Sequence, residues 1–252
     1  MSFGENGQGP LALEKCISKL DLLIVFIKRH GRKTKVTMKV FIKGKGDITL
    51  TDNDFIASGG AGSVYGKQGL AFKIYLDPAN MIPLPKFREL SAIKNDRIIK
   101  PLDILQDPKT NNPIGFTMML LGNHESTPLA QLFTLGFRRK YGIQPEDMLK
   151  LVKDLQNTYT DVHASKCLVI DGNEFSFKVD NKMEKVYVLD VDSFQTPSYP
   201  ATFQMESIKD WHTKGFNSNT DWFAWGIVTF QMLIGIHPFR GFHKVYKDHF
   251  QD

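Results

Sequence analysis

Residues 56–65 read Ile-Ala-Ser-Gly-Gly-Ala-Gly-Ser-Val-Tyr, a glycine-rich loop between two β-prone runs, Phe55–Ala57 and Ser63–Tyr65. Glycine has no Cβ, so backbone N–H groups in such a loop can approach a phosphate closely. The strand–loop–strand setting excludes two rivals: a Walker A loop needs Gly-Lys-Ser/Thr at the start of a helix, and a dinucleotide-binding loop also runs into a helix. Taken alone, the loop is equally compatible with a plain tight turn.

Around the loop, the first half of the chain is rich in short β-prone runs broken by Gly, Asn and Asp, which predicts antiparallel strands. The other runs are Val36–Ile42, Asp47–Thr51, Leu70–Tyr75, Ile98–Leu105 and Ile114–Leu121. The sequence Gly66-Lys67-Gln68-Gly69 predicts a hairpin turn. Pro85 and an apolar stripe predict a helix over Lys86–Lys94. Helical periodicity over Leu11–His30 predicts a further helix that packs on a sheet.

A lysine on the strand after the loop is a candidate phosphate ligand. Lys73 follows Ala71-Phe72, and Glu89 lies sixteen residues further on, in the predicted helix. A lysine among apolar strand neighbours is costly to bury unpaired, so it needs a carboxylate, and Glu89 can supply one. Lys73 would then be positioned to hold nucleotide phosphates. The alternative is a solvated lysine on an edge strand.

The second half of the chain has a helical pattern. A helix is predicted from Pro145 to Val162, and Asp221–Ile234 is apolar nearly all round, as in a helix that crosses a core. Short strands are predicted over Leu168–Ile170, Phe175–Val179 and Val186–Leu189. A β-rich half followed by an α-rich half, with a boundary near Gly122, predicts an α+β fold.

Three aspartates follow two of these short strands. Asp171 follows Leu168–Ile170, and Asp190 and Asp192 follow Val186–Leu189. The nineteen residues between Asp171 and Asp190 predict a hairpin that brings the two strand ends together. One carboxylate could then orient a hydroxyl nucleophile while the other holds Mg²⁺ against ATP phosphates. Alternation along an extended chain would put Asp190 and Asp192 on one side, so the two could share the metal. The alternative is that these residues cap turns.

With the glycine-rich loop, Lys73 and Glu89 in this order, the chain resembles the protein-kinase superfamily. The family loop reads Gly-x-Gly-x-x-Gly-x-Val and precedes a strand that ends in Ala-x-Lys. Here Ala57 stands in place of the first glycine, Ala71-Phe72-Lys73 matches the strand, and Glu89 falls where the family has its helix glutamate. Met118 would be the gatekeeper of a hinge that binds adenine. The residues that the resemblance implies for nucleotide binding are Gly59, Gly60, Gly62, Val64, Lys73, Met119 and Leu121.

The resemblance extends into the second half. Asp171 matches the catalytic aspartate, and Asp190 matches the metal-binding aspartate. The string Asp-Val-Asp-Ser-Phe at 190–194 is similar to that of atypical bacterial and phage kinase-like proteins, and this likeness implies that Asp192 is an alternative or additional metal ligand. His163 would have a structural role, and Asp221, in Asp-Trp-Phe-Ala-Trp-Gly, would hold the backbone of the catalytic loop.

Three departures from the family pattern concern catalysis. Val169 and Ile170 replace the His-Arg pair before Asp171, and Asn173 stands where many protein kinases have a lysine. Ser176 stands where the second metal ligand is normally Asn, and Asn173 could substitute for it, so both are candidate Mg²⁺ ligands.

The resemblance implies a bilobal protein-kinase-like fold with an antiparallel β N-lobe and a mostly α, short or truncated C-lobe. The expected division is a tail and helix over 1–33, an N-lobe over 34–121 and a C-lobe over 122–252. The implied activity is that of an ATP- and Mg²⁺-dependent serine/threonine protein kinase in which Asp171, Lys73 and Glu89 are catalytic. A pseudokinase scaffold, favoured by Ser176, and a kinase of small molecules, favoured by the lack of an Ala-Pro-Glu motif, are the alternatives.

Composition excludes several other classes. The 252 residues are 42% hydrophobic and 23% charged, which excludes wholesale disorder. Two cysteines, Cys16 and Cys167, make no disulfide framework or metal-ligand spacing.

A net charge of +5 suits an anionic ligand and is too weak to indicate nucleic acid. The longest apolar stretch, Leu22–Ile27, is far short of the roughly 20 residues of a membrane span. Met1–Pro10 carries no positively charged side chain, so we expect no secretory signal. We therefore expect a cytoplasmic protein whose partners are ATP and a protein substrate, without nucleic acid or membrane.

Overall fold

The computed structural model describes residues 37–122 and 125–240. The predicted helix over Leu11–His30 and Cys16 lie outside these ranges. The described chain forms two compact units, one of residues 37–81 with 104–116, and one of residues 82–103 with 117–240. The predicted lobe boundary at residue 121/122 stays a prediction.

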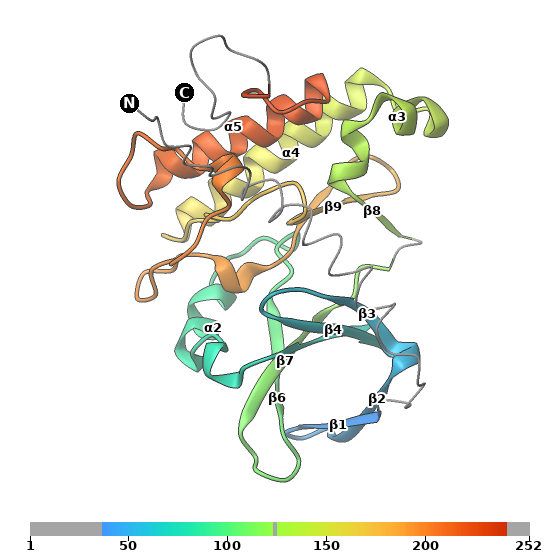
Figure 1. Cartoon of the computed structure of the whole chain (residues 1–252), viewed down its shortest axis with the longest axis vertical. Coiled ribbons are helices and arrows are strands. Elements are labelled where there is room, and N and C mark those ends of the chain that lie inside the picture. The colour runs from blue at the N-terminus through green and yellow to red at the C-terminus, as the bar shows by residue number, and fades with distance from the viewer. Residues whose placement is uncertain (1–36, 123–124, 241–252) are drawn as a thin grey trace, which may run out of the picture. The chain divides into compact units, whose positions relative to one another are not determined.

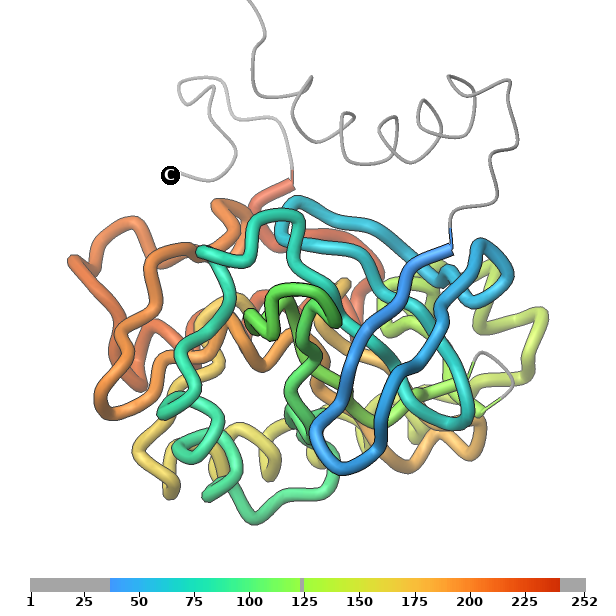
Figure 2. Tube along the Cα trace, turned by 90° about the horizontal axis from the view of Figure 1, so that it is seen from below, coloured from blue at the N-terminus to red at the C-terminus, as the bar shows by residue number. Residues whose placement is uncertain are grey.

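The first unit is built on a curled β-sheet (Figure 1). The seven-stranded sheet has the order β2-β1-β6-β7-β5-β4-β3. Its strands are β1 Thr37–Ile42, β2 Gly46–Thr51, β3 Phe55–Ser58, β4 Gly62–Lys67, β5 Leu70–Tyr75, β6 Pro101–Gln106 and β7 Pro113–Met119. The pairings of β1 with β2 and β6, and of β4 with β3 and β5, are antiparallel, which confirms the predicted arrangement. Figure 2 shows the β1–β2 hairpin in blue.

Two short-range features explain why this sheet forms. Gln68 and Gly69 have φ of 51° and 76°, the left-handed conformation that a tight hairpin turn requires, so the turn predicted at Gly66–Gly69 is confirmed. The inward-facing strand residues then form an apolar core. Its buried members are Val40, Ile42, Leu50, Phe72, Ile74 and Leu105.

The second unit is mostly helical, with a small antiparallel sheet in the order β10-β9-β8. Its helices are α2 Leu84–Ser91, α3 Leu135–Tyr141, α4 Pro145–Ala164 and α5 Ser218–Ile234, and its strands are β8 Ser126–Pro128, β9 Phe177–Asp180 and β10 Val186–Val188. Helices α4 and α5 run side by side (Figure 1). Helix α5 begins at the Asn217 cap, whose side chain accepts from two backbone N–H groups, and ends at Gly235 in the left-handed conformation (φ 89°).

The second unit departs from the predicted elements in several places. Leu168–Ile170 is not a strand, because the N–H groups of Val169 and Ile170 donate to a carboxylate instead of a neighbouring strand. Strand β6 begins three residues later than predicted, because Ile98 forms an isolated bridge with Val188 of β10. Strand β8 and helix α3 were not predicted.

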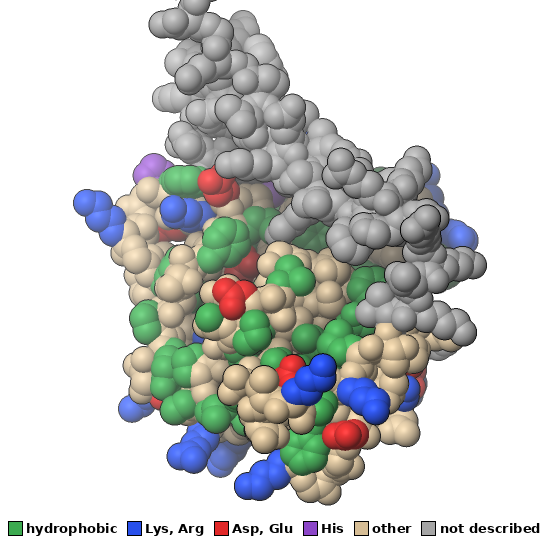
Figure 3. Space-filling model, turned by 60° about the horizontal axis from the view of Figure 1, so that its bottom comes forward, with side chains coloured by type: hydrophobic (Ala, Val, Ile, Leu, Met, Phe, Trp, Pro, Cys, Tyr) green, Lys and Arg blue, Asp and Glu red, His purple; other side chains and the backbone are tan. Residues whose placement is uncertain are grey.

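One face of the described chain carries side chains of several kinds. On the face drawn in Figure 3, hydrophobic, basic and acidic side chains are scattered among other polar side chains and backbone. None of the helices that the structure describes is long and apolar enough to span a membrane.

Candidate functional site

The glycine-rich loop of the first unit is closed at its base and open at its tip. The N–H of Gly59 donates to the carbonyl of Gly62 at 2.9 Å, and the hydroxyls of Ser58 and Ser63 lie 3.1 Å apart. A Cβ added at Gly59 or Gly60 would meet no described atom within 4 Å. The two residues therefore present bare backbone to open space, as a phosphate-binding loop requires.

Gly62 has a different reason to be glycine. It lies opposite Tyr75 in the β4–β5 register, and a Cβ there would lie 2.3 Å from the carbonyl oxygen of Ile74. This contact is backbone against backbone, so no side-chain movement could relieve it. Gly62 thus permits the close approach of β4 to β5, the strand that carries Lys73.

Lys73 lies on β5, opposite Val64 in β4. Strand β5 has β7 on one side and β4 on the other, and the side chain of Lys73 is only 7% exposed, so the alternative of a solvated edge-strand lysine is wrong. Its Nζ lies 5.8 Å from the ring centroid of Tyr75 and 6.0 Å from that of Phe116, within the range of a cation–π contact. Two aromatic faces therefore help to hold the ammonium group among apolar neighbours.

Glu89 lies on α2, in the second unit. Its Oε2 accepts the backbone N–H of Ser198 at 3.2 Å, and hydrogen bonding by Ser198 lowers the pKa of the Glu89 carboxyl. Because Lys73 and Glu89 belong to separate units, the ion pair between them stays a prediction.

A buried carboxylate organises the loop that follows α4. Asp221, in the first turn of α5, is completely buried and accepts the N–H of Val169 at 2.8 Å and that of Ile170 at 2.7 Å. The Nε2 of His163 lies 2.7 Å from its Oδ2. These bonds hold Ile170 at φ 58°, a conformation that a β-branched residue rarely adopts. The roles predicted for Asp221 and His163 are both confirmed.

The next residues, 171–176, form a loop that bonds to itself. The carbonyl of Asp171 accepts the hydroxyl of Ser176 at 2.8 Å and the amide of Asn173 at 3.2 Å. The side chain of Asp171 is half-buried, and its Oδ1 accepts the N–H of Met205 at 2.8 Å. Both the position and the orientation of the Asp171 carboxylate are therefore fixed within the second unit.

Gly172 completes this loop for a steric reason. A Cβ there would lie 2.1 Å from the hydroxyl oxygen of Tyr159, a fully buried residue of α4. That hydroxyl has no hydrogen-bond partner among the described residues, and burial raises the pKa of Tyr159 well above its usual value.

The predicted hairpin between Asp171 and Asp190 is confirmed. Strands β9 and β10 pair antiparallel, and the N–H of Leu189 donates to the carbonyl of Ser176 at 2.8 Å. This bond joins the end of the Asp171 loop to the residue directly before Asp190.

The extended geometry expected over Asp190–Asp192 is wrong. Asp190 is in the left-handed conformation, with φ 52° and ψ 38°, and a 3-10 turn follows over Val191–Ser193. The N–H and hydroxyl of Ser193 both donate to the carbonyl of Asp190, at 3.0 and 2.8 Å, which stabilises the turn. The side chain of Asp190 is exposed, and that of Asp192 is half-buried.

The residues present fit Mg²⁺ only together with a phosphate ligand. The described residues contain no group of three or more His, Cys, Asp or Glu side chains that could hold a metal ion. Asp190 and Asp192 supply carboxylate oxygens, and Mg²⁺ is typically bound by one or two carboxylates together with phosphates and water. Ser176 and Asn173 are buried and engaged in the loop, so metal binding by either stays a prediction.

The predicted hinge residues follow the end of β7. Met119 is the last residue of that strand and is largely exposed, whereas the carbonyl of Leu121 accepts Nζ of Lys178 on β9 at 3.1 Å. Burial lowers the pKa of Lys178. Lys178 was not among the predicted site residues, and neither was Lys86 of α2, whose Nζ donates to the carbonyl of Asp192. Both lysines bind backbone carbonyls. Every residue has a carbonyl, so a sequence motif cannot indicate such a contact.

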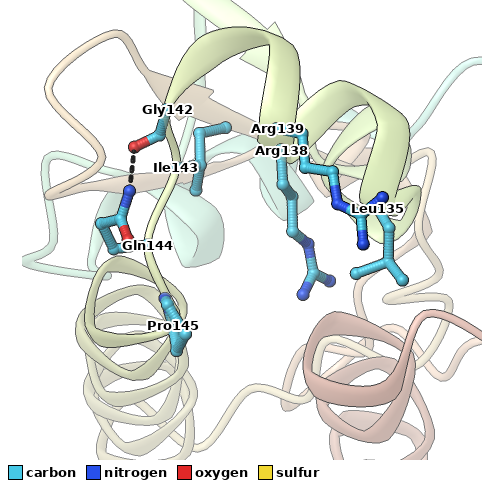
Figure 4. A pocket seen from close by; sticks show the side chains of 7 residues that line it. All are labelled: Leu135, Arg138, Arg139, Gly142, Ile143, Gln144 and Pro145. Atoms are coloured by element: carbon cyan, nitrogen blue, oxygen red, sulfur yellow. Dashed lines mark hydrogen bonds between the residues drawn. The ribbon is translucent and has the colours of Figure 1, made fainter.

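A pocket between α3 and the start of α4 contains none of the predicted site residues (Figure 4). It is lined by Leu135, Arg138, Arg139, Gly142, Ile143, Gln144 and Pro145. The guanidinium of Arg138 donates to the carbonyls of Leu132 and Met232, which gives it a structural role in joining α3 to α5.

Comparison with known proteins supports the fold. No family model matches the chain, and no curated protein does. Among solved structures, the kinase PK-1 of Cydia pomonella granulovirus matches over 74% of this chain and 70% of its own, with a TM-score of 0.56 and 17% identity. Together with the curled antiparallel sheet and the helical unit, this likeness shows that the chain has an α+β, protein-kinase-like fold, as predicted.

Proposed function

We propose that the protein is an ATP-dependent phosphotransferase that acts on serine or threonine hydroxyls of proteins. The observation that carries the proposal is the fixed loop of the second unit. Asp221 holds the backbone directly before Asp171, and the bond from Leu189 to Ser176 joins that loop to the strand that ends before Asp190. Two carboxylates with different surroundings thus lie at the two ends of one hairpin.

Each residue has a distinct role in this proposal. The bare backbone of Gly59 and Gly60 and the ammonium of Lys73 bind phosphate oxygens, with Gly62 and Val64 shaping the strand beneath the loop. Glu89 positions Lys73, and the backbone at Met119 and Leu121 binds the base. A carboxylate oxygen of Asp171 orients the acceptor hydroxyl and accepts its proton. Asp190, assisted by Asp192, holds Mg²⁺, which neutralises phosphate charge when it is bound.

A phosphoryl-transfer assay tests the role of Asp171. With ATP labelled at the γ-phosphate, we expect the wild type to label itself or generic protein substrates. Asp171→Ala should lower transfer by about 10²–10⁴-fold, the usual effect of losing a general base. ATP affinity, measured by calorimetry, should stay within about twofold, because Asp171 acts on the acceptor. The control is Asp96→Asn, whose side chain is 87% exposed. Full transfer by Asp171→Ala would show that another residue serves as the base.

A thermal shift tests the role of Lys73. ATP with Mg²⁺ should raise the melting temperature, because a ligand that binds the native state stabilises it. Lys73→Met should abolish most of that rise, and the exposed Lys39→Met on β1 should keep it. An unchanged wild-type melting temperature at millimolar nucleotide would contradict the proposal.

A pseudokinase scaffold is the second candidate. Asn173 and Ser176 use their polar groups inside the loop, and Asp171 accepts a backbone N–H, so these groups also suffice for a purely structural loop. A wild type that binds ATP and labels neither proteins nor small hydroxyl compounds would favour this candidate. Labelling of small compounds alone would indicate a small-molecule kinase.

A further inference from the structure

Lys86 is a buried lysine of α2 that has no role in the proposed function. Its side chain is 5% exposed, and its Nζ donates to the carbonyl oxygen of Asp192 at 2.8 Å, across 106 residues of sequence. A buried ammonium group is costly unless charges and hydrogen bonds compensate it. Burial lowers the pKa of Lys86, while the nearby charge of Asp192 opposes that effect. A methionine would fill the same space without this cost, which points to a use for the ammonium group.

The helix that carries Lys86 continues into a segment fixed within the second unit. The side-chain amide of Asn95 donates to Asp161 of α4 at 2.7 Å. The N–H of Ile99 donates to the carbonyl of Val188, in β10, at 2.9 Å. Lys86 therefore reaches Asp192 from an element whose following residues are tied to α4 and to the strand that leads into Asp190.

The turn that Lys86 contacts is also closed by local bonds. The N–H and hydroxyl of Ser193 donate to the backbone carbonyl of Asp190, and the N–H of Phe194 donates to the carbonyl of Val191 at 3.1 Å. These bonds close the turn on itself. The bond from Lys86 joins the turn to α2, at the carbonyl of one of the two proposed metal ligands.

We propose that Lys86 is a positioning residue, which fixes the Asp190–Asp192 turn against α2 so that the two carboxylates are ordered for Mg²⁺. The inference rests on the proposed metal role of these aspartates. Two effects of Lys86 on metal affinity have opposite signs. Its hydrogen bond orders the turn and favours Mg²⁺, whereas its positive charge near Asp192 repels Mg²⁺. The ordering effect of the hydrogen bond is larger than the repulsion.

The experiment measures how much Mg²⁺ tightens ATP binding, as the ratio of the ATP dissociation constants without and with the metal. Lys86→Met removes the donor and the charge and keeps the length of the side chain. We expect it to lower the ratio about tenfold. Lys86→Arg, which keeps the charge and a donor, should recover most of it, and Arg88→Met, an exposed cation on the same helix, should leave it unchanged.

Amide hydrogen exchange of the metal-free protein gives a readout that does not depend on the metal. In Lys86→Met, the amides of Ser193 and Phe194 should exchange at least tenfold faster than in the wild type, and in Arg88→Met at the wild-type rate. Melting temperatures identify any variant that has lost its fold; if Lys86→Met has done so, Lys86→Gln, which removes the charge and shortens the side chain, replaces it with the same expected results.

The outcomes separate this inference from the proposed function. An unchanged or raised ratio in Lys86→Met, or unchanged exchange in the turn, would overturn the inference and leave the metal role of Asp190 intact. A wild type without any Mg²⁺ effect would overturn the proposed function, and the metal-positioning role of Lys86 with it.

Discussion

The glycine loop of the first unit and the Asp171 loop of the second unit hold their functional residues in opposite ways. The glycine loop is fixed by strand register at its base and leaves Gly59 and Gly60 facing open space. The Asp171 loop is fixed by side chains, since Asp221 holds the two residues before it and Asn173 and Ser176 bond within it. The first design leaves backbone groups available for a ligand, whereas the second fixes a single carboxylate. This contrast predicts different responses to substitution.

The largest expected effect is at Asp221. Asp221→Ala would leave the buried N–H groups of Val169 and Ile170 without their acceptor, and we expect a loss of about 3–5 kcal/mol in the free energy of unfolding. Chemical denaturation measures it. Asp221→Asn keeps one acceptor oxygen and should lose less, and the exposed Asp96→Asn should change little. A loss below about 1 kcal/mol in Asp221→Ala would show that the loop does not depend on this carboxylate.

An intermediate effect on stability distinguishes Gly62 from Gly60 in the first unit. Gly62→Ala places a Cβ 2.3 Å from a backbone carbonyl, so we expect a loss of about 1–3 kcal/mol, the usual range for overpacking. Gly60→Ala meets open space and should leave stability nearly unchanged, yet weaken ATP binding severalfold. Melting curves and ATP titration of both variants decide this. Equal stability of the two variants would contradict the distinction.

The smallest expected effect concerns pH. Burial lowers the pKa of His237, whose Nε2 lies 2.7 Å from the carbonyl of Ser207. Because the folded pKa lies below that of the unfolded chain, the unfolded state binds more protons in this range. Stability is therefore full above about pH 6.5 and falls as the pH decreases through the folded pKa. His237→Gln should flatten that decline in denaturation curves between pH 7 and 5. An equally steep decline in the variant would assign it to other groups.

The same contrast explains what the sequence could and could not predict. The first unit was predicted well, because its strands alternate with glycine-rich turns whose chemistry is local, as at Gln68 and Gly69. Leu168–Ile170 was predicted wrongly as a strand, because its N–H groups are taken by Asp221, some fifty residues away. The β-propensity of an apolar run says nothing about such a distant acceptor.

The candidate site shows the same limit. The resemblance to kinases gave Asp221 and His163 their confirmed roles, because both lie in recognisable motifs. Lys86 and Lys178 were missed, because each donates to a backbone carbonyl. The left-handed conformation of Asp190 was also missed, since an aspartate after an apolar strand suggests continued extension.

Titration of ATP with and without Mg²⁺ in the wild type, Asp190→Asn and Asp192→Asn tests the central claim most directly. The claim is that the carboxylates after β10 hold the metal with the nucleotide. The account predicts that Mg²⁺ tightens binding in the wild type, that Asp190→Asn abolishes the tightening, and that Asp192→Asn reduces it in part. Loss in Asp192→Asn alone would move the metal site by two residues. A wild type whose ATP affinity is the same with and without Mg²⁺ would contradict the claim.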